Sequence, residues 1–141
     1  MTLPIEKARR EFWAYFAERD PVVGARPHHD TNVWHPMTQD GLGIMSFGIS
    51  QETGSTIFLR GKLHADHDTA APLLRPRARA LEKALITAFE AEGDVGSGRY
   101  LRKRSRESFA VPRNWPEIAR WFTACRLRHA NVQADLIEVS A

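Results

Sequence analysis

The stretch GIMSFGISQETGSTIFLRGKLHA, residues 43–65, decides the fold, because two alternating segments in it flank a short polar turn. In residues 43–50 and 55–65, successive side chains alternate in the period-2 pattern of strands with one covered face. In the second segment, Ile57 and Leu59 fall on one face, and Phe58 and Arg60 fall on the other. Residues 51–54 supply polar turn residues and a glycine that tolerates positive φ. The stretch therefore predicts an antiparallel hairpin.

Helical and extended patterns alternate on both sides of this hairpin. Ala8, Phe12 and Phe16 recur at a spacing of four, which indicates an amphipathic helix that ends at Asp20 before a proline. The expected elements are a helix over 4–19, strands over 31–37, 43–50 and 55–65, a helix over 73–92, one or two strands over 99–104 and 107–111, and a helix from residue 114.

This order predicts an α+β fold: a helix, a three-stranded antiparallel meander, a helix, one or two strands and a C-terminal helix, with the helices packed on one face of the sheet. A length of 141 residues with 43% apolar composition fits a single domain over residues 1–141. One cysteine, Cys125, excludes an internal disulfide and a multi-cysteine zinc site, and its place on an apolar helical stripe predicts a buried packing role.

The distribution of apolar and charged residues along the sequence indicates where the protein is located and where its surface is basic. No stretch approaches the roughly 20 apolar residues that a membrane span needs, and residues 1–12 lack the apolar core of a secretory signal. A cytoplasmic protein with no membrane association and no cofactor is expected. The net charge is only +3, but basic residues dominate after Ala70, which predicts a basic surface on the C-terminal half.

The run RYLRKRSR, residues 99–106, is the main binding candidate. In a regular strand, Arg102, Arg104 and Arg106 would share one face with Tyr100, and guanidinium groups beside an aromatic ring suit phosphate contacts and base stacking. An edge strand whose charges discourage aggregation is the alternative interpretation. The residues proposed to bind nucleic acid or an acidic partner are Arg99, Tyr100, Arg102, Lys103, Arg104, Arg106, Arg75 and Arg79.

Histidines and aspartates around residues 64–68 form a second, weaker candidate. Imidazole and carboxylate groups hold divalent metals, so a metal site would use His64, Asp66 and His67. The spacing matches no established site, and a polar loop with ordinary surface histidines is the alternative interpretation.

The order of elements and the aromatic positions also resemble a bacterial family of unknown function. The matching segments are FWAYF at 12–16, Trp34, the hairpin strands, RALEKALITAF at 79–89 and NWPEIARWF at 114–122. Members of that family often lie C-terminal to a restriction-endonuclease-like nuclease domain and sometimes stand alone. The resemblance implies a fold and an association with DNA-processing or defence systems, and it implies no catalytic residues. Arg75, Arg77 and Arg79 depart from the more acidic helix that is usual there.

Three functional hypotheses follow. The first is a non-enzymatic binding module for a protein partner or nucleic acid, acting through the basic residues. The second is a metal-dependent hydrolase or nuclease that uses the His and Asp cluster. The third is a subunit whose apolar surface is completed by self-association into a homo-oligomer.

Overall fold

The computed structural model describes residues 1–21, 32–36, 43–50, 54–61, 67–93 and 95–140. Its elements are α1 (Ile5–Arg19), β1 (Asn32–Pro36), β2 (Gly43–Ser50), β3 (Gly54–Gly61), α3 (Ala71–Leu74), a 3₁₀ turn (Arg75–Arg77), α4 (Ala78–Leu85), β4 (Arg99–Ser105), a second 3₁₀ turn (Pro112–Asn114) and α5 (Trp115–Ser140). The predicted combination of helices with an antiparallel sheet is confirmed.

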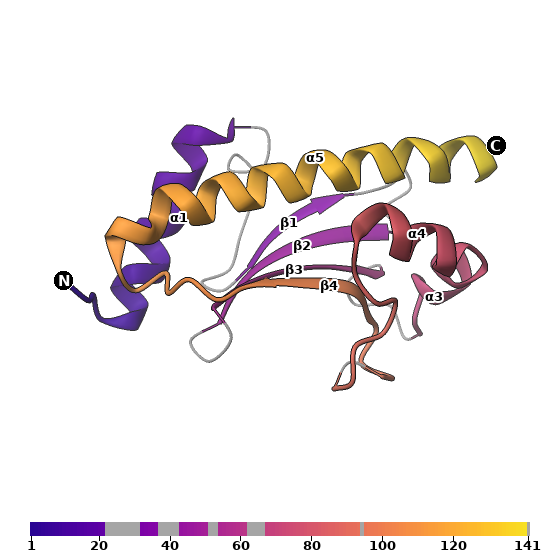
Figure 1. Cartoon of the computed structure of the whole chain (residues 1–141), viewed down its shortest axis with the longest axis horizontal. Helices are drawn as coiled ribbons and strands as arrows, with labels where there is room; N and C mark the ends of the chain where they lie inside the picture. The colour runs from indigo at the N-terminus through magenta and orange to yellow at the C-terminus, as the bar shows by residue number, and fades with distance from the viewer. Residues whose placement is uncertain (22–31, 37–42, 51–53, 62–66, 94, 141) are drawn as a thin grey trace.

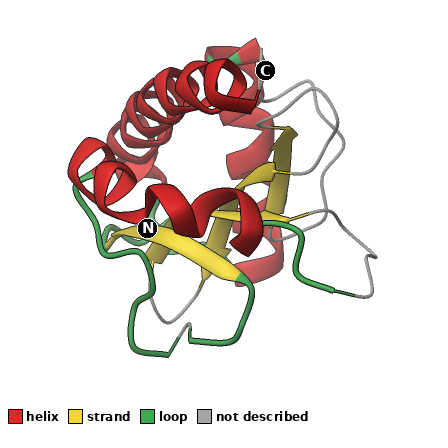
Figure 2. Cartoon of the chain, turned by 90° about the vertical axis from the view of Figure 1, so that its right-hand side faces the viewer, coloured by secondary structure: helices red, strands yellow, loops and turns green. Residues whose placement is uncertain are grey.

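In the described part of the chain, four strands form one sheet in the order β1-β2-β3-β4, each antiparallel to its neighbour. Phe47 pairs with Ile57, and Met45 pairs with Leu59, in the register that the alternating sequence favours. Helix α5 runs alongside the strands, with α1 near one end of them and α4 near the other (Figure 1). Seen from the side, the strands form a twisted layer beside α5 (Figure 2).

The core joins one face of the sheet to the helices. Ile49, Ile57, Leu59 and Tyr100 share that face by register and belong to the same buried cluster as residues of the helices. Several helical residues of this cluster are aromatic, and their rings contact one another across α1 and α5. The ring pairs are Phe12–Trp13, Phe12–Phe16, Phe12–Phe122, Trp13–Phe122 and Phe12–Trp115. Such rings bury large apolar areas and lock α1 against α5.

Helix α1 follows its sequence pattern closely. Ala8, Phe12 and Phe16 are buried as predicted, together with Trp13, and Asp20 is the C-cap that follows its last residue, Arg19. Asp20 is only 3% exposed, and its Oδ2 accepts hydrogen bonds from Arg126 Nε at 2.8 Å and Thr123 Oγ1 at 3.3 Å. The residue that ends α1 therefore also fastens it to α5.

The predicted helix over 73–92 is wrong in its length. The chain forms the short helix α3, a 3₁₀ turn at Arg75–Arg77 and α4, which ends at Leu85 because Ile86 adopts the left-handed conformation, with φ 55°. Pro76 explains the division, since proline lacks the donor that a continuous helix needs. The expected strand over 107–111 is also wrong, because this segment forms turns that lead into the second 3₁₀ turn.

The last helix begins at Trp115, and Cys125 is buried on it as predicted. Ile118, Phe122, Cys125 and His129 are buried along it. The strand expected to end at residue 65 is described only to Gly61, and the predicted turn at 51–53 lies outside the described residues. Within the described helices, none is long and apolar enough to cross a membrane.

The Asp20–Arg126 pair gives a test of this packing. Replacing Asp20 with alanine leaves a guanidinium that is only 15% exposed without its carboxylate, so we expect the free energy of unfolding to fall by roughly 3 kcal/mol. Glu18→Ala breaks a solvent-exposed pair with Arg19 and should cost at most about 1 kcal/mol. Urea denaturation of both variants measures the difference. Equal losses in the two variants would contradict the structural role of Asp20.

Candidate functional site

Strand β4 does not alternate regularly, and its irregularity arranges the basic residues. Tyr100 pairs with Leu59, and Lys103 pairs with Ile57, so two residues of β4 lie opposite the single residue Phe58 of β3. Leu101 is one of these two, and it has a φ of 57°. This is a β-bulge, which inserts a residue and reverses the alternation of all that follows.

The bulge decides which side chains share a face. Arg99 pairs with Arg60 before the bulge, and Arg104 pairs with Thr56 after it. Arg60 and Thr56 are four residues apart in a regular strand, so both arginines lie on the face away from the core. Without the inserted residue, Arg104 would face the core.

Two hydrogen bonds from the segment after α4 hold the bulge. The amide of Leu101 donates to the carbonyl of Phe89 at 2.9 Å, and the hydroxyl of Thr87 donates to the carbonyl of Arg102 at 2.6 Å. Phe89 itself donates its amide to Glu82 Oε2 at 2.8 Å, and its ring stacks on Tyr100. Because α4 ends at Leu85, the residues that follow it, Thr87 and Phe89, are free to make the hydrogen bonds that fix the conformation of β4.

Phe58 lies on the face of the sheet away from the core, between the positions of Arg99 and Arg104. It is 4% exposed but stands outside the main core cluster. The guanidinium carbons of Arg99 and Arg102 lie 5.0 Å and 5.6 Å from the centroid of its ring. Both distances fall within the range of cation–π attraction, so one ring orders two cationic groups.

We call this set the arginine face, and it comprises Phe58, Arg60, Arg99, Arg102 and Arg104. Arg99 and Arg104 are exposed, and Arg60 and Arg102 are half-buried. None of the four strands contains an aspartate or glutamate. Among the described residues, no carboxylate lies within ion-pair distance of Arg99 or Arg104. The face is therefore a concentration of positive charge that a polyanion can neutralise.

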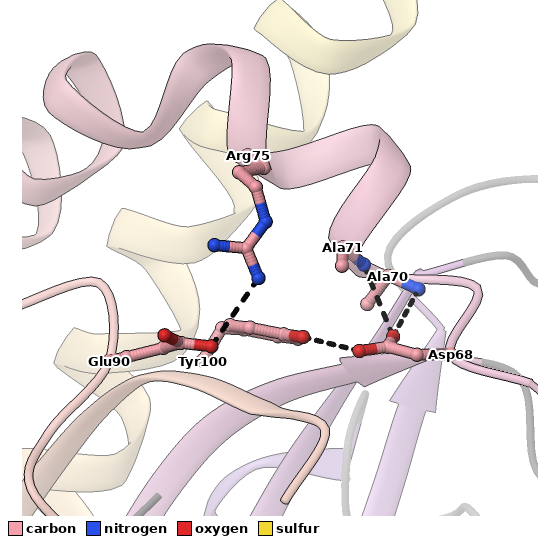
Figure 3. A network of polar contacts seen from close by, with 6 residues as sticks. All are labelled: Asp68, Ala70, Ala71, Arg75, Glu90 and Tyr100. Atoms are coloured by element: carbon pink, nitrogen blue, oxygen red, sulfur yellow. Dashed lines mark hydrogen bonds and ion pairs between the residues drawn. The ribbon is translucent and has the colours of Figure 1, made fainter. Parts of the chain in front are cut away.

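The prediction that Tyr100 belongs to this surface is wrong, because the bulge separates it from the arginines. Tyr100 is 3% exposed on the core face, and its hydroxyl donates to Asp68 Oδ2 (Figure 3). Burial and this bond raise the pKa of Tyr100 to about 12. A buried, protonated phenol with a fixed acceptor contributes to packing and is not open for base stacking.

Asp68 organises the start of α3 as well. Its Oδ1 accepts the amides of Ala70 at 2.9 Å and Ala71 at 3.1 Å (Figure 3). Burial alone would raise the pKa of Asp68, but the bonds from Tyr100 and these amides, helped by the charge of Arg75, bring it below its usual value. Asp68 therefore ties β4 to α3 as a carboxylate.

The other predicted basic residues lie apart. Arg75 Nη2 lies 3.5 Å from Glu90 Oε1 (Figure 3). The guanidinium carbon of Arg75 also lies over the ring of Phe89, 5.5 Å from its centroid. Arg79 is exposed on α4, and Arg106 is exposed just beyond β4. Lys103 pairs with Ile57 on the core face and is half-buried, so the bulge places it on the opposite face from Arg99 and Arg104.

The proposed metal ligands are not brought together by any described contact. His64 and Asp66 lie outside the described residues, and His67 is exposed. Within the part of the chain that the structure describes, no group of three or more His, Cys, Asp and Glu side chains could hold a metal ion.

Two further features lie on α5. A groove of about 540 Å³ separates it from the end of α1, lined by Tyr15, Arg19, Pro116, Ala119, Arg120, Thr123, Ala124 and Leu127. On its buried side, His129 Nδ1 donates to the carbonyl of Cys125 at 2.7 Å, and Nε2 has no hydrogen-bond partner among the described residues. Burial raises the pKa of the Cys125 thiol, which fits the predicted packing role.

Phe58 and Arg60 were absent from the predicted site, although the sequence carried their signal. Their alternation with Ile57 and Leu59 places them on the face away from the core. The sequence did not show which strand lies beside them, since β4 lies about 40 residues further along the chain.

No protein-family model, curated protein or solved structure matches this chain, so the family resemblance stays a prediction.

The buried imidazole predicts a dependence of stability on pH. Burial lowers the pKa of His129 from 6.5 to about 4, so the unfolded chain binds the proton more tightly than the folded one. The contribution of His129 is complete above pH 6.5 and is lost as the pH falls toward 4, by up to about 3 kcal/mol. Urea denaturation at pH 7, 5.5 and 4.5 measures this loss. His129→Gln should flatten the profile, and an unchanged profile in that variant would contradict the assignment.

Proposed function

We propose that this protein is a binding module that holds nucleic acid on the arginine face. The observation that carries the proposal is the pair of guanidinium groups, those of Arg99 and Arg102, ordered over the ring of Phe58. Guanidinium groups donate hydrogen bonds in pairs to phosphate oxygens and stay charged at every physiological pH. The proposal concerns binding, and no catalytic residue enters it.

The extent of the face suits a chain of phosphates better than one small anion. Arg60 and Thr56, the partners of Arg99 and Arg104, are four residues apart, so the basic residues span about 13 Å along the strand at ~3.3 Å per residue. The sequences of the strands contribute no carboxylate to oppose a polyanion. Each phosphate that the face neutralises releases counterions, which favours binding at low salt.

The proposal also requires the arginine face to be open, with the helices packed on the other face of an antiparallel meander. The membership of the core supports this arrangement. Ile57 and Leu59 join the helical residues in the core cluster, whereas Phe58 does not. The exposure of Arg99 and Arg104 agrees with it.

An acidic protein surface could use the same arginines. We favour nucleic acid as the partner, because guanidinium groups can contact nucleobases as well as phosphates. A link to DNA-processing or defence systems, which the family resemblance implies, remains a prediction.

Replacing three arginines of the face gives the direct test. We expect Arg99→Gln, Arg102→Gln and Arg104→Gln together to weaken binding of labelled DNA and RNA oligonucleotides. The slope of log K against log salt for single strands should fall by about 2, since three phosphate contacts are lost at roughly 0.7 each. Fluorescence anisotropy at several salt concentrations measures both effects.

The matched control removes three exposed positive charges elsewhere, with Arg10→Gln, Arg113→Gln and Arg120→Gln. It lowers the net charge equally, so it should weaken binding far less than the variant of the arginine face. Equal weakening in the two triple variants would mean that net charge alone binds the oligonucleotide. Absence of binding by the wild-type protein at low salt would overturn the nucleic-acid proposal and favour an acidic protein partner.

A further inference from the structure

We infer that two copies of this chain pair through the groove between α1 and α5, with the two α5 helices antiparallel. The occupant of each groove is the α5 helix of the other copy. The groove belongs to the helices and the arginine face belongs to β3 and β4, so the inference goes beyond the proposed function and does not depend on it.

One ridge of α5 borders the groove and is left uncovered by the rest of its own chain. Pro116, Arg120, Thr123 and Leu127 recur at spacings of three and four residues, so they lie on one face of the helix. Leu127 is 54% exposed, which is unusual for a large apolar side chain beside an apolar groove. A second surface that covers this ridge removes Leu127 from water, which favours association.

The sizes of the side chains along this part of α5 are self-complementary. Ala119, Thr123 and Leu127 are spaced by four residues, with the small side chain at one end and the large one at the other. A two-fold axis at Thr123 that makes the helices antiparallel brings Leu127 of each copy beside Ala119 of the other. Ala119 is 4% exposed and lines the groove, so the large side chain packs against a small residue in a hollow.

The charges on one flank of α5 are complementary in the same arrangement. Glu117 and Arg128 are exposed and lie on the same flank of the helix, within about 20° of each other. Thr123 lies midway between them to within one residue. The axis at Thr123 therefore places Glu117 of each copy beside Arg128 of the other, whereas a parallel pairing would place like charges side by side. Glu117 also contacts Arg120 of its own chain, and a carboxylate has two oxygens that can accept both partners.

The arrangement of α1 leaves room for this pairing. Helix α1 crosses α5 near the start of α5, and the later half of α5 extends beyond it (Figure 1). In an antiparallel pair, the later half of each α5 lies over the groove of the other copy. The two α1 helices are then at opposite ends of the interface and do not meet.

Sedimentation velocity over a range of concentrations tests the pairing. We expect the wild type to shift from monomer to dimer as its concentration rises from micromolar to submillimolar. Leu127→Glu puts a charge into the hollow, so it should raise the dissociation constant of the dimer at least about tenfold. The matched control is Val95→Glu, which adds the same charge at a 72% exposed aliphatic residue outside the groove. This control should dimerise as the wild type does, and circular dichroism establishes that each variant is folded.

Exchanging the charges of the flank tests the antiparallel arrangement. Glu117→Lys alone and Arg128→Glu alone each place like charges opposite each other, so each should raise the dissociation constant by about fivefold. The double variant restores opposite charges and should return to within about twofold of the wild type. The two residues are roughly 16 Å apart along one helix, so this recovery cannot arise within a single chain.

The results that would overturn the inference are specific. A wild type that stays monomeric throughout the range would do so, and so would equal dissociation constants for the Leu127→Glu and Val95→Glu variants. A double variant as weak as the single ones would also contradict it, because the antiparallel contact would then be absent. The proposed function is unaffected by these results, since its variants lie on β4.

Discussion

The conformation of β4 depends on two hydrogen bonds that join it to the end of α4. The amide of Leu101 and the carbonyl of Arg102 are bound by Phe89 and Thr87, at the place where β4 gains an extra residue. Leu101 and Ile86 are the non-glycine residues with positive φ in the described chain, and a left-handed conformation costs roughly 1–2 kcal/mol for each. The strained end of the helix and the strained strand thus lie in contact, and each supplies the hydrogen bonds that keep the other in place.

Burial of Tyr100 and Leu101 in the core offsets this backbone strain. Leu101 is fully buried, and Tyr100 beside it stacks on Phe89 and donates to Asp68. In a regular strand Tyr100 and Leu101 would lie on different faces of the sheet, so Leu101 could not be buried on the same face as Tyr100. The apolar side of β4 therefore selects the bulge, and the bulge in turn determines where the arginines project.

The consequence for recognition is a surface whose charges are close together and already ordered. Bringing four arginines onto one face is unfavourable in the absence of a ligand, since like charges repel. Phe58 reduces this cost by attracting the guanidinium groups of Arg99 and Arg102. On the other side of the sheet, aromatic packing and the buried Asp20–Arg126 pair hold α1 against α5.

Local sequence was sufficient wherever periodicity and short-range sterics determine the structure. It predicted that α1 ends at Asp20, that residues alternate around Ile57, that Cys125 is buried on the last helix, and that a basic run forms β4. It did not predict the end of α4 at Leu85 or the bulge at Leu101, because both rest on hydrogen bonds between segments about 15 residues apart. A regular strand would have placed Tyr100 with Arg102 and Arg104. The sequence by itself thus determined that an antiparallel hairpin and a basic strand exist, and only the tertiary structure decided which arginines share the outer face of the sheet, because one inserted residue reverses the alternation of a strand.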